Sequence, residues 1–114
     1  MDIFKLEIYI PESHLKALQA ALQASGAGRI GNYDSCMAHS HVKGTWRPLE
    51  GANPYIGEVG TLSEAYELKV EVNVEKDRLK RTIQAIRDIH PYEEPLINVI
   101  PLYPTLTGAK APSS

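Results

Sequence analysis

Hydrophobic and polar residues alternate from Ile3 to Ile10 and again from Ala65 to Val74. A period of two residues is typical of a β-strand that has one buried face. A weaker run of the same kind covers Asn32 to His41, and a short apolar run follows at Leu96 to Val99. The pattern therefore predicts four strands.

Two further stretches repeat their apolar residues every three or four positions, which is the spacing of one helix face. The first stretch follows Pro11, carries leucines at this spacing and ends at Gly26, and the second covers Glu75 to Ile89. Proline in the first turn and glycine after the last are common helix boundaries. The order strand, helix, strand, strand, helix, strand predicts an α+β, ferredoxin-like sandwich, in which two helices cover one face of a four-stranded antiparallel sheet.

The second face of this predicted sheet has no helix to cover it. The polar positions of the first and third strands would share it: Lys5, Glu7, Tyr9, Glu67, Lys69 and Glu71. Because these strands are neighbours in the ferredoxin-like order, opposite charges can pair between them. Alternation alone leaves two readings open, a face exposed to solvent or a face that packs against further copies of the chain.

Composition limits the class of protein. A chain of 114 residues with 43% hydrophobic content predicts one domain, residues 1–103. The remaining residues, 104–114, are rich in Pro, Gly, Ala, Ser and Thr, and we expect a flexible tail there. Twelve basic against fourteen acidic residues give a net charge of -2 without a basic block, which argues against nucleic acid as a partner.

Cys36 is the single cysteine, so no internal disulfide can form, and no apolar run has the length of a signal peptide or a membrane span. These features predict a cytoplasmic protein that does not enter a membrane.

The segment from Gly26 to Gly31 matches the G-x-G-x-x-G pattern of dinucleotide-binding loops. The glycines here follow a predicted helix and precede a predicted strand, which is the reverse of the order that points a helix N-terminus at a pyrophosphate. The segment therefore predicts a helix C-cap and a tight turn.

Cys36, His39 and His41 are metal-ligand types within six residues. On a strand the two histidines share a face and Cys36 lies on the other, so a zinc or copper site would need a further ligand from His14, His90 or a second subunit. The alternative is a pair of exposed imidazoles.

The segment from Gly44 to Ser63 is unusually long for a connection between neighbouring strands, and it contains Trp46, Arg47 and Tyr55. Its aromatic residues, glycines and prolines favour an ordered loop that closes over a pocket or packs against another subunit.

A stiff connector follows the second predicted helix, where Pro91 and Pro95 enclose three polar residues, Tyr92, Glu93 and Glu94. A structural turn is the favoured interpretation. An acid/base site using His90 and Glu93 is the alternative.

Four short motifs carry a resemblance to a known family: GNY at residues 31–33 with Cys36 after it, GTWRP at 44–48, GANPYIGEVG at 51–60 and HPYEEP at 90–95. Over residues 1–103 the chain resembles the YqfO-type insert domain of the NGG-interacting-factor family. That domain is in turn similar to the cation-tolerance protein CutA and to PII signalling proteins.

The resemblance implies a ferredoxin-like fold that forms trimers with the sheets facing inward. In longer bacterial members the domain lies between two halves that hold a dimetal centre, so the resemblance implies no hydrolase activity for this chain. PII proteins carry their effector loop between the second and third strands, where this chain has its long loop. The segment from Ala38 to Lys43 departs from the family pattern, and its two histidines are particular to this chain.

These observations lead to one hypothesis, a cytoplasmic, non-enzymatic homotrimer that binds a ligand or regulates a partner. Its ligand-binding or interface cleft would contain eight residues: Tyr33, Trp46, Arg47, Tyr55, His90, Tyr92, Glu93 and Glu94. The first alternative is a protein of zinc or copper binding or tolerance that uses His39 and His41. The second is a small enzyme that uses His90 and Glu93.

Overall fold

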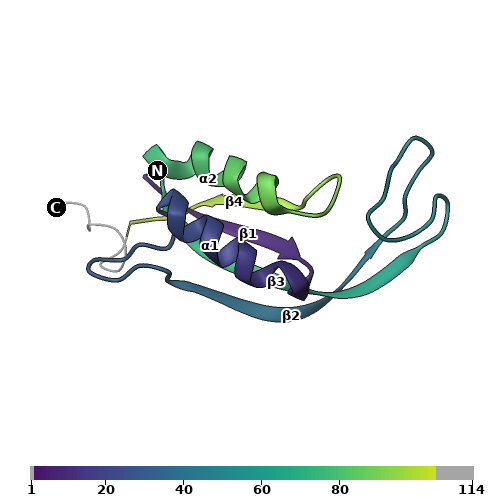
Figure 1. Ribbon diagram of the computed structural model, residues 1–114. Coiled ribbons are helices and arrows are strands. Elements are labelled where there is room, and N and C mark those ends of the chain that lie inside the picture. The colour runs from purple at the N-terminus through teal and green to yellow at the C-terminus, as the bar shows by residue number, and fades with distance from the viewer. Residues whose placement is uncertain (1, 105–114) are drawn as a thin grey trace.

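The computed structural model describes residues 2–104. Its sheet contains four strands: β1 (Ile3–Ile10), β2 (Met37–Trp46), β3 (Ser63–Glu75) and β4 (Ile97–Pro101). Their order across the sheet is β2-β3-β1-β4, and every neighbouring pair is antiparallel. Two helices, α1 (Leu15–Ser25) and α2 (Lys76–Ile89), lie together on one face of the sheet (Figure 1). The predicted α+β, ferredoxin-like sandwich is confirmed.

The core lies between the helices and the sheet. The apolar positions of β1 and β3 point toward the helices, and Leu6, Ile8 and Val70 are fully buried there. Leu18 and Ile86 meet them from α1 and α2. The period of two in the strands and the helical period in the helices therefore predicted the core correctly.

A buried polar contact joins the end of α1 to α2. The Thr82 hydroxyl donates to Ser25 Oγ at 3.0 Å, and the Ser25 hydroxyl donates to the Leu22 carbonyl. Arg81 Nε donates to the Ser25 carbonyl at 2.8 Å. Each buried hydroxyl thus has a partner, and α2 also supplies a donor for the carbonyl at the end of α1.

β2 begins and ends later than the predicted strand, Asn32 to His41. Ile30 and Tyr33 exchange two backbone hydrogen bonds of 2.9 Å, so the chain turns here and does not extend. The strand starts only at Met37, and it continues until its tryptophan pairs with Ser63. The predicted bounds of this strand were wrong, because the hydrophobic pattern did not show the turn that joins Ile30 to Tyr33.

Other predicted boundaries shift by one or two residues, as helix and strand ends commonly do. β3 extends the predicted run of Ala65 to Val74 at both ends, α2 begins one residue after Glu75, and β4 replaces the predicted Leu96 to Val99. The predicted flexible tail, residues 104–114, lies outside the described residues except for Pro104.

The three glycines between α1 and β2 all have positive φ angles, 90° at Gly26, 75° at Gly28 and 56° at Gly31. Gly26 forms the left-handed C-cap of α1, and its N–H donates to the Gln23 carbonyl. The predicted helix cap and turn are confirmed.

The face of the sheet opposite the helices carries a network of ion pairs. Lys5 pairs with Glu71 and, at 3.7 Å, with Glu7, and Lys69 approaches Glu7 at 3.3 Å. The hydrogen bond from the Asn98 side chain and the neighbouring lysines lower the pKa of Glu7. The predicted cross-strand pairing is confirmed on this open face of the sheet.

The far end of the β2–β3 hairpin extends past the helices (Figure 1). We call this part the arm, residues 44–65, and the segment between α2 and β4 the connector, residues 90–96. No helix within the described residues is long and apolar enough to cross a membrane.

Candidate functional site

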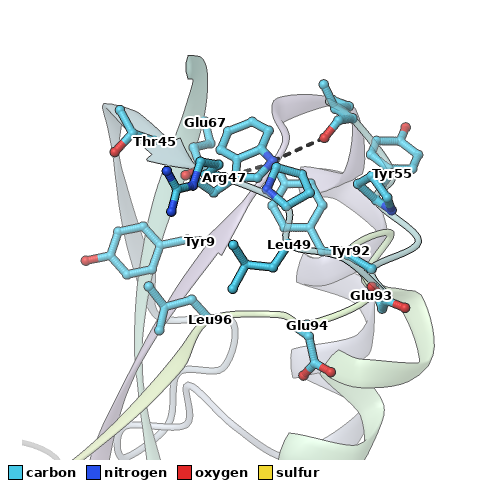
Figure 2. Close-up of a pocket in the computed structure, with 15 residues that line it drawn as sticks. Tyr9, Thr45, Arg47, Leu49, Tyr55, Glu67, Tyr92, Glu93, Glu94 and Leu96 are labelled. Carbon is cyan, nitrogen blue, oxygen red and sulfur yellow. Dashed lines mark hydrogen bonds between the residues drawn. The ribbon is translucent and has the colours of Figure 1, made fainter. Parts of the chain in front are cut away.

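The arm and the connector enclose a pocket of about 480 Å³ at one end of the open sheet face (Figure 2). Tyr9 and Glu67 form its floor from the sheet. Residues 45–49, 52 and 54–56 of the arm contribute one wall, and residues 92–94 and 96 of the connector contribute the other. Most of the lining is aromatic or aliphatic. The pocket thus combines an apolar surface with a few charged groups, which is the usual make-up of a small-molecule site.

His90 holds the start of the connector in place. Its Nε2–H donates to the Tyr9 carbonyl at 2.7 Å, and its Nδ1 accepts the Tyr92 N–H at 3.2 Å. Burial lowers the pKa of His90, and the positive charge that His14 can carry lowers it further, although the bond to Tyr9 acts in the opposite direction. Both ring nitrogens are therefore occupied by backbone groups, and the imidazole is neutral.

Glu67 and Tyr92 form a polar pair inside the pocket. The Tyr92 hydroxyl donates to Glu67 Oε2 at 3.1 Å, and Glu67 as a whole is only 9% exposed. Burial, and after it the charge of Glu67, raise the pKa of Tyr92 to about 12. The phenol therefore stays protonated at neutral pH and remains a donor to the carboxylate.

Gly44 makes room for this carboxylate. It lies on the strand next to Glu67, and a Cβ added at Gly44 would collide with Glu67 Oε1 and meet the carboxylate carbon at 3.2 Å. The three atoms nearest to such a Cβ all belong to Glu67. The glycine is therefore matched to one buried side chain.

We expect Gly44→Ala to lower the free energy of unfolding by about 1–3 kcal/mol, the usual cost of adding an atom to a packed site. The added methyl group would displace the Glu67 carboxylate and weaken its bond to Tyr92. Urea denaturation of the variant against the parent measures the loss.

The double variant Gly44→Ala/Glu67→Ala gives the matched control. Because the atoms nearest to the new methyl group belong to Glu67, the alanine at position 44 should cost almost nothing once the carboxylate is absent. An equal cost in both backgrounds would show that the glycine serves some other purpose.

Hydrogen bonds within the arm order its loop. The Trp46 indole N–H donates to the Ile56 carbonyl at 3.1 Å, and the Gly60 N–H donates to the Pro48 carbonyl at 2.7 Å. The dashed line in Figure 2 marks the bond from the indole. The predicted ordered loop is confirmed for the described structure.

The arm also contacts the connector directly. The Asn53 N–H donates to Glu93 Oε1 at 2.9 Å. The Tyr92 ring packs between those of Trp46 and Tyr55, at centroid distances of 6.3 and 6.0 Å, and lies 4.9 Å from the His90 ring. One hydrogen bond and a group of rings in tilted contact therefore hold the two walls of the pocket together.

The structure brings most of the predicted cleft residues together. Six of them line the pocket: Trp46, Arg47, Tyr55, Tyr92, Glu93 and Glu94. His90 lies behind the wall and supports Tyr92. Tyr33 is in the turn before β2, at the opposite end of that strand from Trp46, and is 74% exposed. Ligand binding by these residues stays a prediction.

Sequence reasoning missed two residues at the floor of the pocket. Tyr9 and Glu67 were assigned to the open face but not to a site, because alternation does not show where a distant loop folds over a sheet. Gly44, diagonally across from Glu67 on the neighbouring strand, was a usable signal, since a residue without a side chain beside a strand carboxylate indicates close packing.

The structure does not gather the three predicted metal ligands. The Cys36 thiol donates to the Asp34 carbonyl at 3.7 Å, whereas His41 Nε2 lies 3.8 Å from a Glu12 carboxylate oxygen. Across residues 2–104 no three His, Cys, Asp or Glu side chains converge as a metal site would require. The zinc or copper site stays a prediction without geometric support from this chain.

Comparison with solved structures gives the class of fold. The chain superposes on the periplasmic divalent cation tolerance protein CutA from Archaeoglobus fulgidus with a TM-score of 0.63 at 15% identity, over 88% of this chain and 83% of that one. At this identity the match concerns the fold alone, and it shows a CutA-like sandwich.

Proteins of higher sequence identity point to a family within this fold class. A Halalkalibacterium halodurans protein named GTP cyclohydrolase 1 type 2 homolog is 40% identical over 101 residues, which are 89% of this chain and 27% of that protein. A Bacillus cereus protein related to NIF3 superposes with a TM-score of 0.78 at 33% identity, over 89% of this chain and 26% of the other. No protein-family model matches the chain.

The predicted resemblance to the NGG-interacting-factor family is confirmed by these matches. The chain is homologous to one segment of such proteins and spans about a quarter of the length of the curated relatives it matches.

Proposed function

We propose that this protein is a homotrimeric, non-enzymatic module of the CutA/PII-like type, and that it binds its ligand in the pocket between the arm and the connector. The observation that carries the proposal is the pocket itself, which is formed within a single chain and has a volume of about 480 Å³. A cavity of this size accepts a small organic molecule.

The pocket walls are held before any ligand arrives. The bond from Asn53 to Glu93 joins arm and connector, and the two bonds of His90 fix the connector to β1. A site whose walls are already ordered loses less conformational entropy on binding. This supports a binding role for the pocket.

The groups suggested for an enzyme are engaged elsewhere. Both His90 nitrogens meet backbone atoms, and the Glu93 carboxylate accepts the Asn53 N–H. A general acid or base must reach the proton that it transfers. These contacts favour structural roles for His90 and Glu93, in line with a binding module.

Exposed apolar side chains in and next to the arm support self-association. Leu62 of the arm and Tyr66, which directly follows it, are 64% and 79% exposed. β2 and β4 are the two edges of the sheet and leave backbone groups that another copy can pair with. Both features fit an assembly in which arms contact neighbouring sheets.

Light scattering coupled to size-exclusion chromatography tests the assembly. We expect a mass of three times the 12.6 kDa of the chain at micromolar concentration. The variant Tyr66→Glu should lower the mass, because it would place a charge on this exposed apolar surface. The matched control Lys80→Glu, on the exposed side of α2, should remain trimeric. A monomer for the unmodified protein would contradict the proposal.

A further inference from the structure

We propose that the pocket selects a flat organic cation, a molecule that carries an amidinium-like group on an aromatic ring. This inference rests on the pocket proposed above as the binding site and adds the chemical class of its ligand. Three features support it: the charge balance of the lining, the environment of Glu67 and the aromatic wall.

The pocket lining carries more negative than positive charge. Glu67, Glu93 and Glu94 contribute three carboxylates, and Arg47 is the only lysine or arginine of the lining. In Figure 2 the Glu94 carboxylate points away from the aromatic wall, whereas Glu67 and Arg47 lie together at the opposite end of the pocket. The field inside the pocket therefore favours a cation.

Glu67 is the carboxylate that a ligand would meet. Within the described residues it receives one hydrogen bond, from Tyr92, and no lysine, arginine or histidine nitrogen lies within 4.0 Å of its oxygens. A nearly buried carboxylate is normally paired with a cation or with several donors. A ligand with two N–H groups on a positive centre would supply what the protein does not.

The aromatic wall suits the body of such a ligand. Trp46, Tyr55 and Tyr92 line the pocket within one cluster, and Tyr9 lies across from them beside Leu96 (Figure 2). A cation gains energy over the face of an aromatic ring, and a flat ligand can stack there without ordering many bonds of its own.

Arg47 provides the main competing interpretation, an anionic ligand. A carboxylate or phosphate that paired with Arg47 would also lie near Glu67, whose charge would repel it. We therefore expect Arg47→Ala to strengthen binding of a cation, because the substitution removes a like charge from the pocket. An anion site would show the reverse.

Three probes of similar shape test the charge preference: benzamidinium, neutral benzamide and anionic benzoate. Trp46 is the single tryptophan, so its indole N–H gives one resonance that reports on the pocket during each titration. We expect benzamidinium to bind at least about tenfold more tightly than benzamide, the effect of one charge-assisted pair, and benzoate to bind more weakly still.

Glu67→Gln tests the residue directly, since its amide oxygen can still accept the Tyr92 hydroxyl. The variant should bind benzamidinium about tenfold more weakly and benzamide unchanged. The matched control Glu71→Gln, on the same strand and outside the pocket, should behave as the parent protein. Equal affinity for all three probes, or preference for benzoate, would overturn the cation class but keep the pocket as a site. Failure of every probe to move the Trp46 resonance would overturn the pocket as well.

Discussion

Replacement of His90 by alanine should lower the free energy of unfolding by about 2–4 kcal/mol, the cost of two unsatisfied backbone groups together with a lost packed ring. His90 as a whole is 8% exposed, and its imidazole bonds to the Tyr9 carbonyl and to the Tyr92 N–H. Without it, β1 and the connector lose their shared anchor. Chemical denaturation of the variant and the parent measures the difference.

The stability that His90 provides should also depend on pH in a defined direction. Its pKa in the folded protein is lowered, so the unfolded chain binds a proton at a higher pH than the folded one does. The stabilisation by His90 is therefore complete above pH 6.5, the ordinary pKa of histidine. It is lost as the pH falls through the lower pKa that His90 has in the folded protein. Denaturation on both sides of 6.5 should show this decline in the parent and a smaller decline in His90→Ala.

His39→Ala is the matched control, because this histidine is exposed on β2 and forms none of the contacts that hold the connector. Its stability should stay within about 0.5 kcal/mol of the parent, as for most surface substitutions. A similar loss in both variants, or an unchanged pH dependence in His90→Ala, would show that the connector does not depend on the buried imidazole.

Leu18→Ala should lower the free energy of unfolding by about 2–5 kcal/mol, as expected for a buried leucine that leaves a cavity. Leu18 is fully buried on the inner side of α1 and packs in the cluster that joins both helices to the sheet. Calorimetric melting and urea denaturation should agree on the loss.

Leu62→Ala makes the same chemical change at a site that is 64% exposed. In the isolated subunit the substitution should change the free energy of unfolding little. In the assembled protein any loss of stability should depend on protein concentration. If Leu18→Ala cost no more than Leu62→Ala, the core described for this fold would be wrong.

The sequence was sufficient for the layers of the fold. Periodicity located Leu6, Ile8 and Leu18 on the buried faces, because the large apolar residues of β1 and of α1 recur at the period of a strand and of a helix. It misplaced the bounds of β2, because the turn that joins Ile30 to Tyr33 depends on backbone hydrogen bonds that leave little trace in composition.

The candidate site was predictable only in part. Trp46, Arg47 and the connector residues stood out through their residue types and their prolines, and the structure places them around one pocket. Glu67 did not stand out, since a carboxylate at a polar strand position normally faces solvent. Its burial depends on a long-range contact between the sheet and the segments that fold over it, and Gly44 on the neighbouring strand is the sequence signal that could have indicated it.

Contact between the arm and the connector can be observed directly in solution. Nuclear Overhauser effects between the single Trp46 indole and the Tyr92 ring, whose centroids lie 6.3 Å apart, would show that arm and connector enclose the pocket without a ligand. We expect clear cross-peaks between protons of the two rings. Their absence, with Trp46 shifts typical of an unstructured loop, would contradict a preformed pocket.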